Sequence, residues 1–174
     1  SESEFSARFI AGLNGEVVEL GRTCVHIDFR SGGGIMFLWS GIAQLMKRWD
    51  IDYLLGCASV PCRDDGQLVQ TLMNGLRAKY MSPQSLRAKP RVPVNPWSGS
   101  EVDGAIMPPL LKAYLRLGAW VCGEPSLDEE FGVADLMVLL DMRELNHRYF
   151  KHFLGRESKA ADQVGKPQEV AITA

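Results

Sequence analysis

The chain has 174 residues, with a hydrophobic fraction of 46% and a charged fraction of 23%, which are ordinary values for one soluble globular domain. Its formal net charge of −2 argues against a general nucleic-acid-binding protein, because such proteins are normally strongly basic. No apolar run approaches the roughly 20 residues that a membrane-spanning helix needs, and no signal-peptide pattern is visible. These features predict a cytoplasmic protein without nucleic acid as a partner.

The cysteines and histidines do not form a recognisable metal or disulfide pattern. The four cysteines, Cys24, Cys57, Cys62 and Cys122, lack C-x-x-C spacing and are expected to be reduced, packed thiols. Cys24 as a nucleophile is the alternative, but no base for it can be identified. His147 and His152 are five residues apart and therefore do not share a helical face, so no metal site is expected.

Residues 1–15 are interpreted as a tail or short helix that leads into a strand over 16–27. Strict alternation along this strand would put Glu19 and Arg22 on opposite faces. A β-bulge near Gly21 would place both on one polar face, close enough to pair. The alternative is a continuous strand on which Glu19 and Arg22 are unrelated surface charges.

A glycine-rich turn follows, formed by Arg30, Ser31, Gly32, Gly33 and Gly34. Apolar residues from Ile35 to Trp49 then recur at helical spacing, and 51–60 is a nearly continuous apolar run stopped by Pro61. Strand, helix and strand in this order predict a right-handed crossover with parallel strands. The turn would lie at a helix N-terminus, where free N–H groups favour an anion. A tight connection without a ligand is the alternative, since the turn matches no named phosphate motif.

The middle of the chain predicts a helix over 64–81, with Asp64 as N-cap and Gln67 completing a capping box. Residues 82–106 are rich in Pro and Gly and form a long connection without obvious secondary structure. Its basic residues Arg87, Lys89 and Arg91 could meet the acidic surface of a partner protein or anionic lipid headgroups. The alternative is a solvated loop.

The last third predicts a helix that starts at Pro108 and Pro109 and ends at Gly118. Strands over 119–123 and 133–140 are expected to pair in antiparallel fashion across an acidic loop. A last helix is expected over 141–154, and composition predicts a flexible tail over 155–174.

Five blocks carry a resemblance to a known family: ELGRTCVH at 19–26, DFRSG at 28–32, GCASV at 56–60, MPPLLKAYLRLGA at 107–119 and ADL at 134–136. In this order they resemble the ornithine N-acyltransferase family of bacterial ornithine-lipid synthesis. That family is similar to the GNAT superfamily and, more distantly, to acyl-homoserine-lactone synthases.

The resemblance implies a GNAT-like α/β fold with a mixed sheet. Residues 1–154 would be the C-terminal part of the N-acyltransferase domain, without the family's N-terminal strands in this chain. Family members transfer a 3-hydroxyacyl chain from acyl carrier protein to the α-amine of ornithine. A cytoplasmic location, with peripheral contact at the inner face of the cytoplasmic membrane, would suit that activity.

The resemblance also implies roles for named residues. The phosphopantetheine arm of the acyl carrier protein would lie between the strands 16–27 and 51–60, with its phosphate at Gly32–Gly34 beside Arg30 and Ser31. Glu19 would be the amine-orienting base, and Arg22 its partner or a contact for the substrate carboxylate. No permanently bound cofactor is expected. The turn departs in spacing from the GNAT pattern Q/R-x-x-G-x-G/A, which favours a carrier protein over coenzyme A as the donor.

Two alternatives remain open at this stage. One is an N-acylase with another acceptor amino acid, or a coenzyme-A-dependent acetyltransferase. The other is a non-catalytic module that binds acyl carrier protein.

Overall fold

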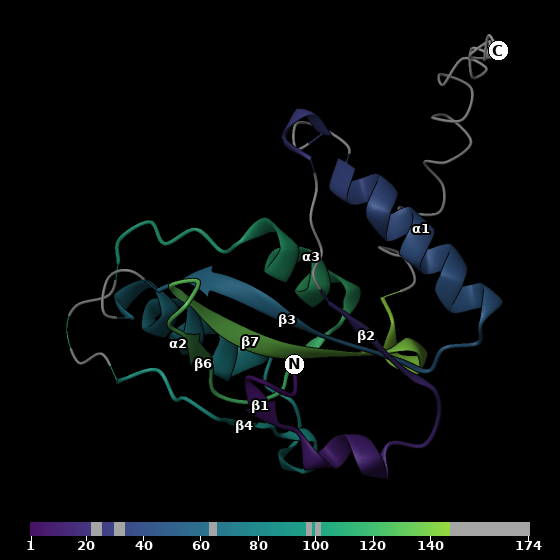
Figure 1. Cartoon of the computed structure of the whole chain (residues 1–174), viewed down its shortest axis with the longest axis horizontal. Helices are drawn as coiled ribbons and strands as arrows, with labels where there is room; N and C mark the ends of the chain where they lie inside the picture. The colour runs from purple at the N-terminus through teal and green to yellow at the C-terminus, as the bar shows by residue number, and fades with distance from the viewer. Residues whose placement is uncertain (22–25, 30–33, 63–65, 97–98, 100–101, 147–174) are drawn as a thin grey trace, which may run out of the picture.

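A mixed β-sheet forms the centre of the computed structural model, which describes residues 1–21, 26–29, 34–62, 66–96, 99 and 102–146. Its strands lie in the order β2 (Val17–Leu20), β3 (Tyr53–Pro61), β7 (Val133–Asp141) and β5 (Trp120–Val121) (Figure 1). β2 is parallel to β3, β7 is antiparallel to β3 and β5, and β6 (Ser126–Asp128) pairs with β7 farther along its length. The predicted α/β class with a mixed sheet is confirmed.

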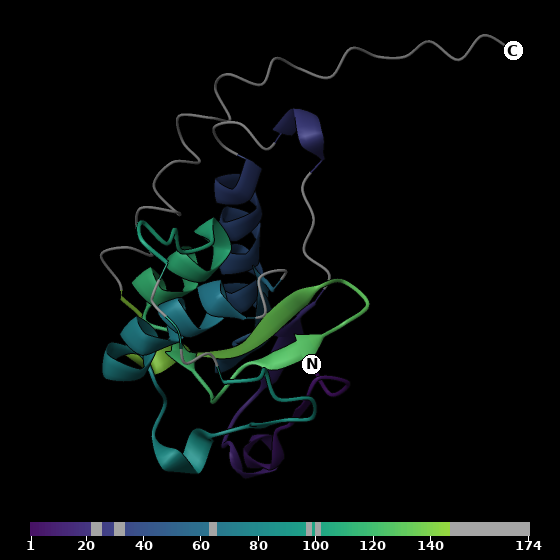
Figure 2. The same ribbon diagram turned by 90° about the vertical axis from the view of Figure 1, so that its left-hand side faces the viewer.

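Three helices cover one face of this sheet: α1 (Gly34–Arg48), α2 (Gln67–Lys79) and α3 (Pro109–Leu117) (Figure 2). Each helix directs an apolar stripe inward, because its apolar residues recur every three or four positions. Trp39 and Met46 of α1, Leu76 of α2 and Leu111 of α3 belong to one buried cluster. The ring of Trp39 meets that of Tyr114 edge to face, with centroids 5.0 Å apart.

The opposite face is covered by two segments that are far apart in the sequence. The first is β1 (Phe5–Ser6) with the 3-10 helix η1 (Arg8–Gly12), and the second is the 3-10 helix η3 (Gln84–Leu86) with β4 (Lys89–Pro90). β1 and β4 pair in antiparallel fashion. Phe5, only 2% exposed, packs into a second buried cluster with Tyr53, Leu55, Ala88, Cys122, Met137 and Leu139. The first residues are therefore fixed to the sheet rather than forming a free tail.

Several predicted elements are confirmed. The crossover places β2 and β3 parallel with α1 between them, and β5 and β7 are antiparallel. α3 begins at Pro109, and Gly118 is its C-cap with φ of +102°, a conformation that favours glycine.

Other boundaries differ from the predictions. The strand predicted over 16–27 ends at Leu20, and Ile27–Phe29 form a 3-10 helix, η2; the region of the predicted bulge beyond Gly21 lies outside the described residues. The predicted capping box is wrong, because α2 begins at Gln67 with Gly66, at φ of +88°, as its N-cap.

The connection 82–106 contains η3 and β4, and the acidic loop contains β6. The helix predicted over 141–154 is wrong for its described part. Asp141 ends β7 and caps a 3-10 turn, η4 (Met142–Glu144), by accepting a hydrogen bond from the backbone N–H of Arg143.

Candidate functional site

Three neighbouring strands change from apolar to polar on one face of the sheet, the face that carries Phe5. In the apolar part, Leu55 of β3 and Leu139 of β7 belong to one buried cluster, and the partly buried Val17 of β2 packs against it. Side chains two residues apart point to the same side of a strand. Farther along this face of the sheet the side chains are polar, namely Glu19, Cys57, Ser59 and Asp135. The sheet therefore presents a polar corner beside the second core cluster.

In the described part of the chain the sheet also opens at this corner, because β2 pairs with β3 as far as Leu20 and Gly56, whereas β3 continues to Pro61. In the antiparallel ladder with β7, every second residue of β3 directs its backbone N–H and C=O groups toward β7, and the residues between direct theirs to the other side. Two backbone bonds, from Met142 N to Asp52 O and from Cys62 N to Gly132 O, bind even-numbered residues to the β7 side. The odd-numbered residues of β3 therefore face β2, as the bond from Tyr53 N to Glu16 O shows. The parallel pairing of Leu20 with Gly56 uses the N–H of Cys57, so the C=O of Cys57 and both backbone groups of Ser59 are the ones directed beyond Leu20.

A cavity of about 820 Å³ occupies this opening. Ala58 and Leu111 line it from the helix-covered face, whereas Cys57 and Ser59 line it from the other face. The cavity thus passes the free edge of β3 and reaches both faces of the sheet. Its lining consists of Ser1, Ser3, Glu4, Glu19, Leu20, Gly21, Cys57, Ala58, Ser59, Leu110, Leu111, Phe131 and Asp135.

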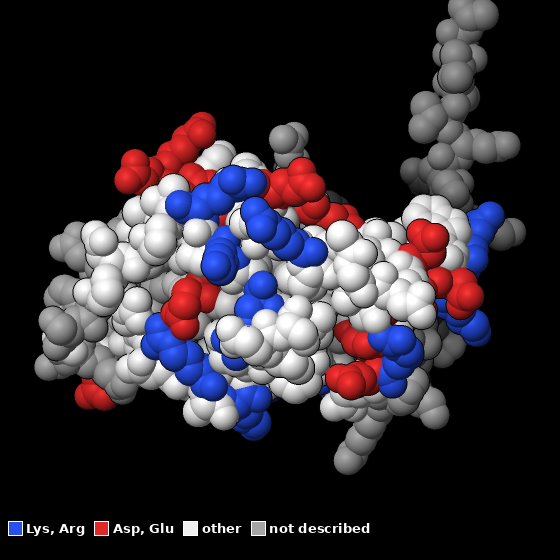
Figure 3. Space-filling view, turned by 90° about the horizontal axis from the view of Figure 1, so that it is seen from below, with Lys and Arg blue, Asp and Glu red and all other residues white. Residues whose placement is uncertain are grey.

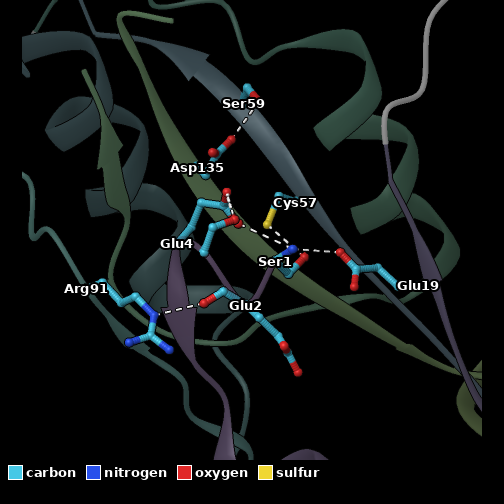
Figure 4. A network of polar contacts seen from close by, with 9 residues as sticks. Ser1, Glu2, Glu4, Glu19, Cys57, Ser59, Arg91 and Asp135 are labelled. Carbon is cyan, nitrogen blue, oxygen red and sulfur yellow. Dashed lines mark hydrogen bonds and ion pairs between the residues drawn. The ribbon is translucent and has the colours of Figure 1, made fainter. Parts of the chain in front are cut away.

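A polar network crosses the cavity (Figure 4). The amino nitrogen of Ser1 lies 2.7 Å from Oε1 of Glu19 and 3.3 Å from Oε2 of Glu4. The Ser1 hydroxyl lies 3.2 Å from Sγ of Cys57. On the paired strands β3 and β7, the hydroxyl of Ser59 donates a 2.6 Å hydrogen bond to Oδ1 of Asp135.

The two strand carboxylates have opposite pKa shifts. The hydrogen bond from the Ser1 amino group lowers the pKa of Glu19, which keeps this half-exposed side chain ionised. Burial raises the pKa of Asp135, and the hydrogen bond from Ser59 opposes that effect in part. A low-pKa carboxylate is suited to hold an amine, whereas a buried carboxylate needs a cationic partner to be stable in its charged form.

The structure describes only two of the residues that the sequence predicted for the site. Glu19 lies in the cavity wall, and Gly34 is the first residue of α1. Arg22, Arg30, Ser31, Gly32 and Gly33 lie outside the described residues, so their roles stay predictions.

Sequence reasoning missed Glu4, Ser59 and Asp135. The signal for Asp135 was present as one acidic residue inside an otherwise apolar strand. Glu4 carried no such signal, because its position depends on the pairing of β1 with the distant β4.

The described residues contain no group of three or more His, Cys, Asp or Glu side chains that could hold a metal ion. None of the described helices has both the length and the apolar character that crossing a bilayer requires.

The predicted basic cluster lies on the face that carries β1 and β4, and Figure 3 shows Lys and Arg gathered there with Asp and Glu among them. Nε of Arg87 donates to Ser82 O, and Nε of Arg91 donates to Glu2 O. Lys89 is exposed.

Comparison with known proteins shows that this chain is similar to acyltransferases. The model of the acetyltransferase (GNAT) domain family matches residues 1–40. The chain is 29% identical over 161 residues to L-ornithine N(alpha)-acyltransferase of Rhodobacter capsulatus, covering 89% of this chain and 62% of that protein. It is 32% identical over 151 residues to the protein of the same name from Brucella abortus, covering 80% of this chain and 52% of that protein.

A third similar protein, L-ornithine N(alpha)-acyltransferase of Agrobacterium fabrum, is 28% identical over 172 residues, covering 91% of this chain and 57% of that protein. The chain thus spans 52–62% of the length of these curated relatives. No solved structure gives a significant match. The resemblance to ornithine N-acyltransferases and the GNAT-like fold class are confirmed.

Proposed function

We propose that this protein is an N-acyltransferase that moves a 3-hydroxyacyl chain from acyl carrier protein to the α-amine of ornithine, giving lyso-ornithine lipid. The names of its similar proteins support ornithine as the acceptor. One observation carries the proposal: the cavity at the end of the β2–β3 pairing, with Glu19 in its wall. It offers one place where a thioester arm and an amine can meet.

The donor arm enters along the free edge of β3. The backbone N–H of Ser59 suits a carbonyl oxygen of a phosphopantetheine arm, and the C=O of Cys57 suits one of the arm's amide N–H groups. Leu110 and Leu111 supply apolar wall for the start of the acyl chain. The phosphate of the arm is expected at Gly32–Gly34, next to the N-terminus of α1, where the helix dipole favours an anion.

The acceptor amine takes the position marked by the Ser1 nitrogen, within hydrogen-bonding distance of Glu19. An ammonium has no lone pair, so it must lose a proton before attack, and Glu19 accepts that proton directly or through one water. The amine nitrogen then bonds to the thioester carbon and the carbon–sulfur bond breaks. The nitrogen gives its second proton to the departing thiolate, which leaves as the pantetheine thiol, and Glu19 releases the first proton to solvent. No covalent enzyme intermediate is formed.

The remaining contacts are assigned by charge and exposure. Arg22 pairs with Glu19 or binds the acceptor carboxylate. Arg87, Lys89 and Arg91 offer positive charge to acyl carrier protein. Phe37 on α1 and Trp49, just after the end of α1, are each 60% exposed. With the basic Lys47 and Arg48 in the last turn of the helix, they suit peripheral contact with an anionic membrane surface.

The decisive assay incubates the purified protein with acyl carrier protein that carries a labelled 3-hydroxyacyl group, together with ornithine. N-acyl-ornithine is the expected product. Product only from acyl-coenzyme A or another amino acid would favour the broader N-acylase or acetyltransferase. Complex formation with acyl carrier protein without turnover would favour a non-catalytic module.

Two matched variants test the role of Glu19. Glu19→Gln removes the carboxylate from the cavity wall and should lower turnover 100-fold or more with little change in carrier binding, in the usual range for general-base catalysis of about 10²–10⁴. Glu16→Gln changes an exposed carboxylate just before the same strand, outside the cavity, and should retain turnover. Equal turnover of both variants removes Glu19 from the mechanism.

A further inference from the structure

Asp135 is a second carboxylate in the proposed acceptor site, and its surroundings differ from those of Glu19. Asp135 is 7% exposed and lies in the cavity wall. Its neighbours along β7, Ala134 and Leu136, are buried and apolar. Among the described residues, only Oδ1 has a hydrogen-bond partner, the Ser59 hydroxyl. The other oxygen, Oδ2, is therefore available to a group inside the cavity.

Glu4 connects Asp135 with Glu19. Figure 4 shows the three carboxylates in a row, with Glu4 between Asp135 and the Ser1 nitrogen, and Glu19 on the far side of that nitrogen. The negative charge of Glu4 adds to the effect of burial in raising the pKa of Asp135, and it opposes in part the lowering of the Glu19 pKa by the Ser1 amino group. Glu4 is held in place by its neighbour Phe5 in the core and by the bond from Arg91 N to Glu4 O.

The described lining of the cavity thus carries three carboxylates and one cation, the Ser1 ammonium, which pairs with Glu19 and Glu4 but has no ion pair with Asp135. The negative charges therefore exceed the positive charge, and the excess lies at Asp135. A single ammonium against Glu19 leaves the buried end, at Asp135, without compensation. An acceptor with a second ammonium, separated from the first by a short carbon chain, compensates both ends.

We propose that Asp135, oriented by Ser59 and assisted by Glu4, binds the side-chain ammonium of the acceptor and thereby selects a diamino acid. This inference rests on the proposed function, because it assumes that the cavity receives the acceptor. Glu19 and Asp135 then have separate tasks: Glu19 holds the amine that reacts, and Asp135 holds the amine that must not react. The same division explains how an enzyme can acylate one of two amines in a single substrate.

Direct binding tests this assignment without acyl transfer. Calorimetric titration of the purified protein compares ornithine with norvaline, which has the same carbon chain but no side-chain amine. We expect ornithine to bind at least tenfold more tightly. Asp135→Asn, which keeps the size of the side chain and an acceptor for Ser59, should reduce ornithine binding to the level of norvaline and leave norvaline unchanged. Glu130→Gln, an exposed change outside the cavity, should retain the full preference.

Several outcomes overturn the assignment: equal affinity of the unmodified protein for both amino acids, no binding of ornithine, a preference that survives Asp135→Asn, or an equal loss for both ligands in that variant. Failure of the proposed function looks different. In that case the protein discriminates ornithine from norvaline through Asp135 but forms no amide with any acyl donor.

Discussion

Gly56 is the position at which a single methyl group tests the opening of the sheet. It is the last β3 residue paired with β2, opposite Leu20. A Cβ atom added there would lie 2.8 Å from the backbone oxygen of Leu20 and 3.7 Å from Oη of Tyr114. The first contact is shorter than ordinary carbon–oxygen contacts allow and involves backbone rather than a flexible side chain. Gly56→Ala must therefore displace the end of β2, beside Glu19.

The cost can be bounded from the structure. Overpacking of a closely packed site costs typically about 1–3 kcal/mol, which for a chain of this size lowers the melting temperature by roughly 2–12 °C, at about 2–4 °C per kcal/mol. Thermal unfolding followed by circular dichroism measures this change. Because the displaced Leu20 lies next to Glu19, acyl transfer measured well below the melting temperature should fall as well.

Gly75→Ala is the matched control, since Gly75 lies inside α2 and an added Cβ meets nothing within 4 Å. The higher helix propensity of alanine should stabilise this variant by up to about 1 kcal/mol. Opposite shifts in melting temperature for the two variants are expected. A Gly56→Ala protein as stable and as active as the unmodified one would show that β2 and β3 do not meet at Leu20 as described.

Three further predictions concern the polar corner and its support. Phe5→Ala should destabilise the fold by about 3–5 kcal/mol in urea unfolding, because it empties a buried site that also holds Glu4 in place; a loss under 1 kcal/mol would show that β1 is not docked. Burial raises the pKa of Cys57 to about 11 and of Cys122 to about 12, so mass spectrometry should find both alkylated at pH 8 at least tenfold more slowly than in urea. Burial raises the pKa of Asp135 above its ordinary 3.8, so its contribution to stability is full below that pH and is lost as pH rises through the higher folded value. Asp135→Asn should therefore gain stability relative to the unmodified protein between pH 3.5 and pH 7, and a constant difference in melting temperature would contradict this.

The crossover and α3 could be predicted from the sequence because local patterns determine them. The apolar spacing of α1, the run before Pro61 and the Pro109 and Gly118 boundaries of α3 each reflect the geometry of one element. The strand predicted to reach residue 27 was too long for the opposite reason. Its β-branched residues favour extended backbone locally, but Ile27 belongs to the 3-10 helix η2, and the described pairing of β2 with β3 ends at Leu20 and Gly56.

The candidate site was predicted only in part. Glu19 was found because it belongs to a recognisable block on a strand. Glu4 was not, since it reaches the cavity through the pairing of Phe5 with Pro90, a contact between residues far apart in the chain. Ser59 and Asp135 occupy opposite positions of an antiparallel pair, and no local pattern gives that register.

The polar corner costs the fold stability in several ways, which is itself an argument for function. Among the described residues, β3 presents backbone groups of Ser59 to a cavity instead of to a strand, and Asp135 carries a carboxylate into a place where burial disfavours its charge. An apolar side chain at position 135 would continue the pattern of its buried neighbours Ala134 and Leu136 and would remove that cost. Proteins tolerate such local costs where a ligand compensates them. A cation bound between Asp135 and Glu4 would offset the electrostatic part of this cost, so the carboxylates that weaken the site without a ligand are the ones that would make ornithine binding favourable.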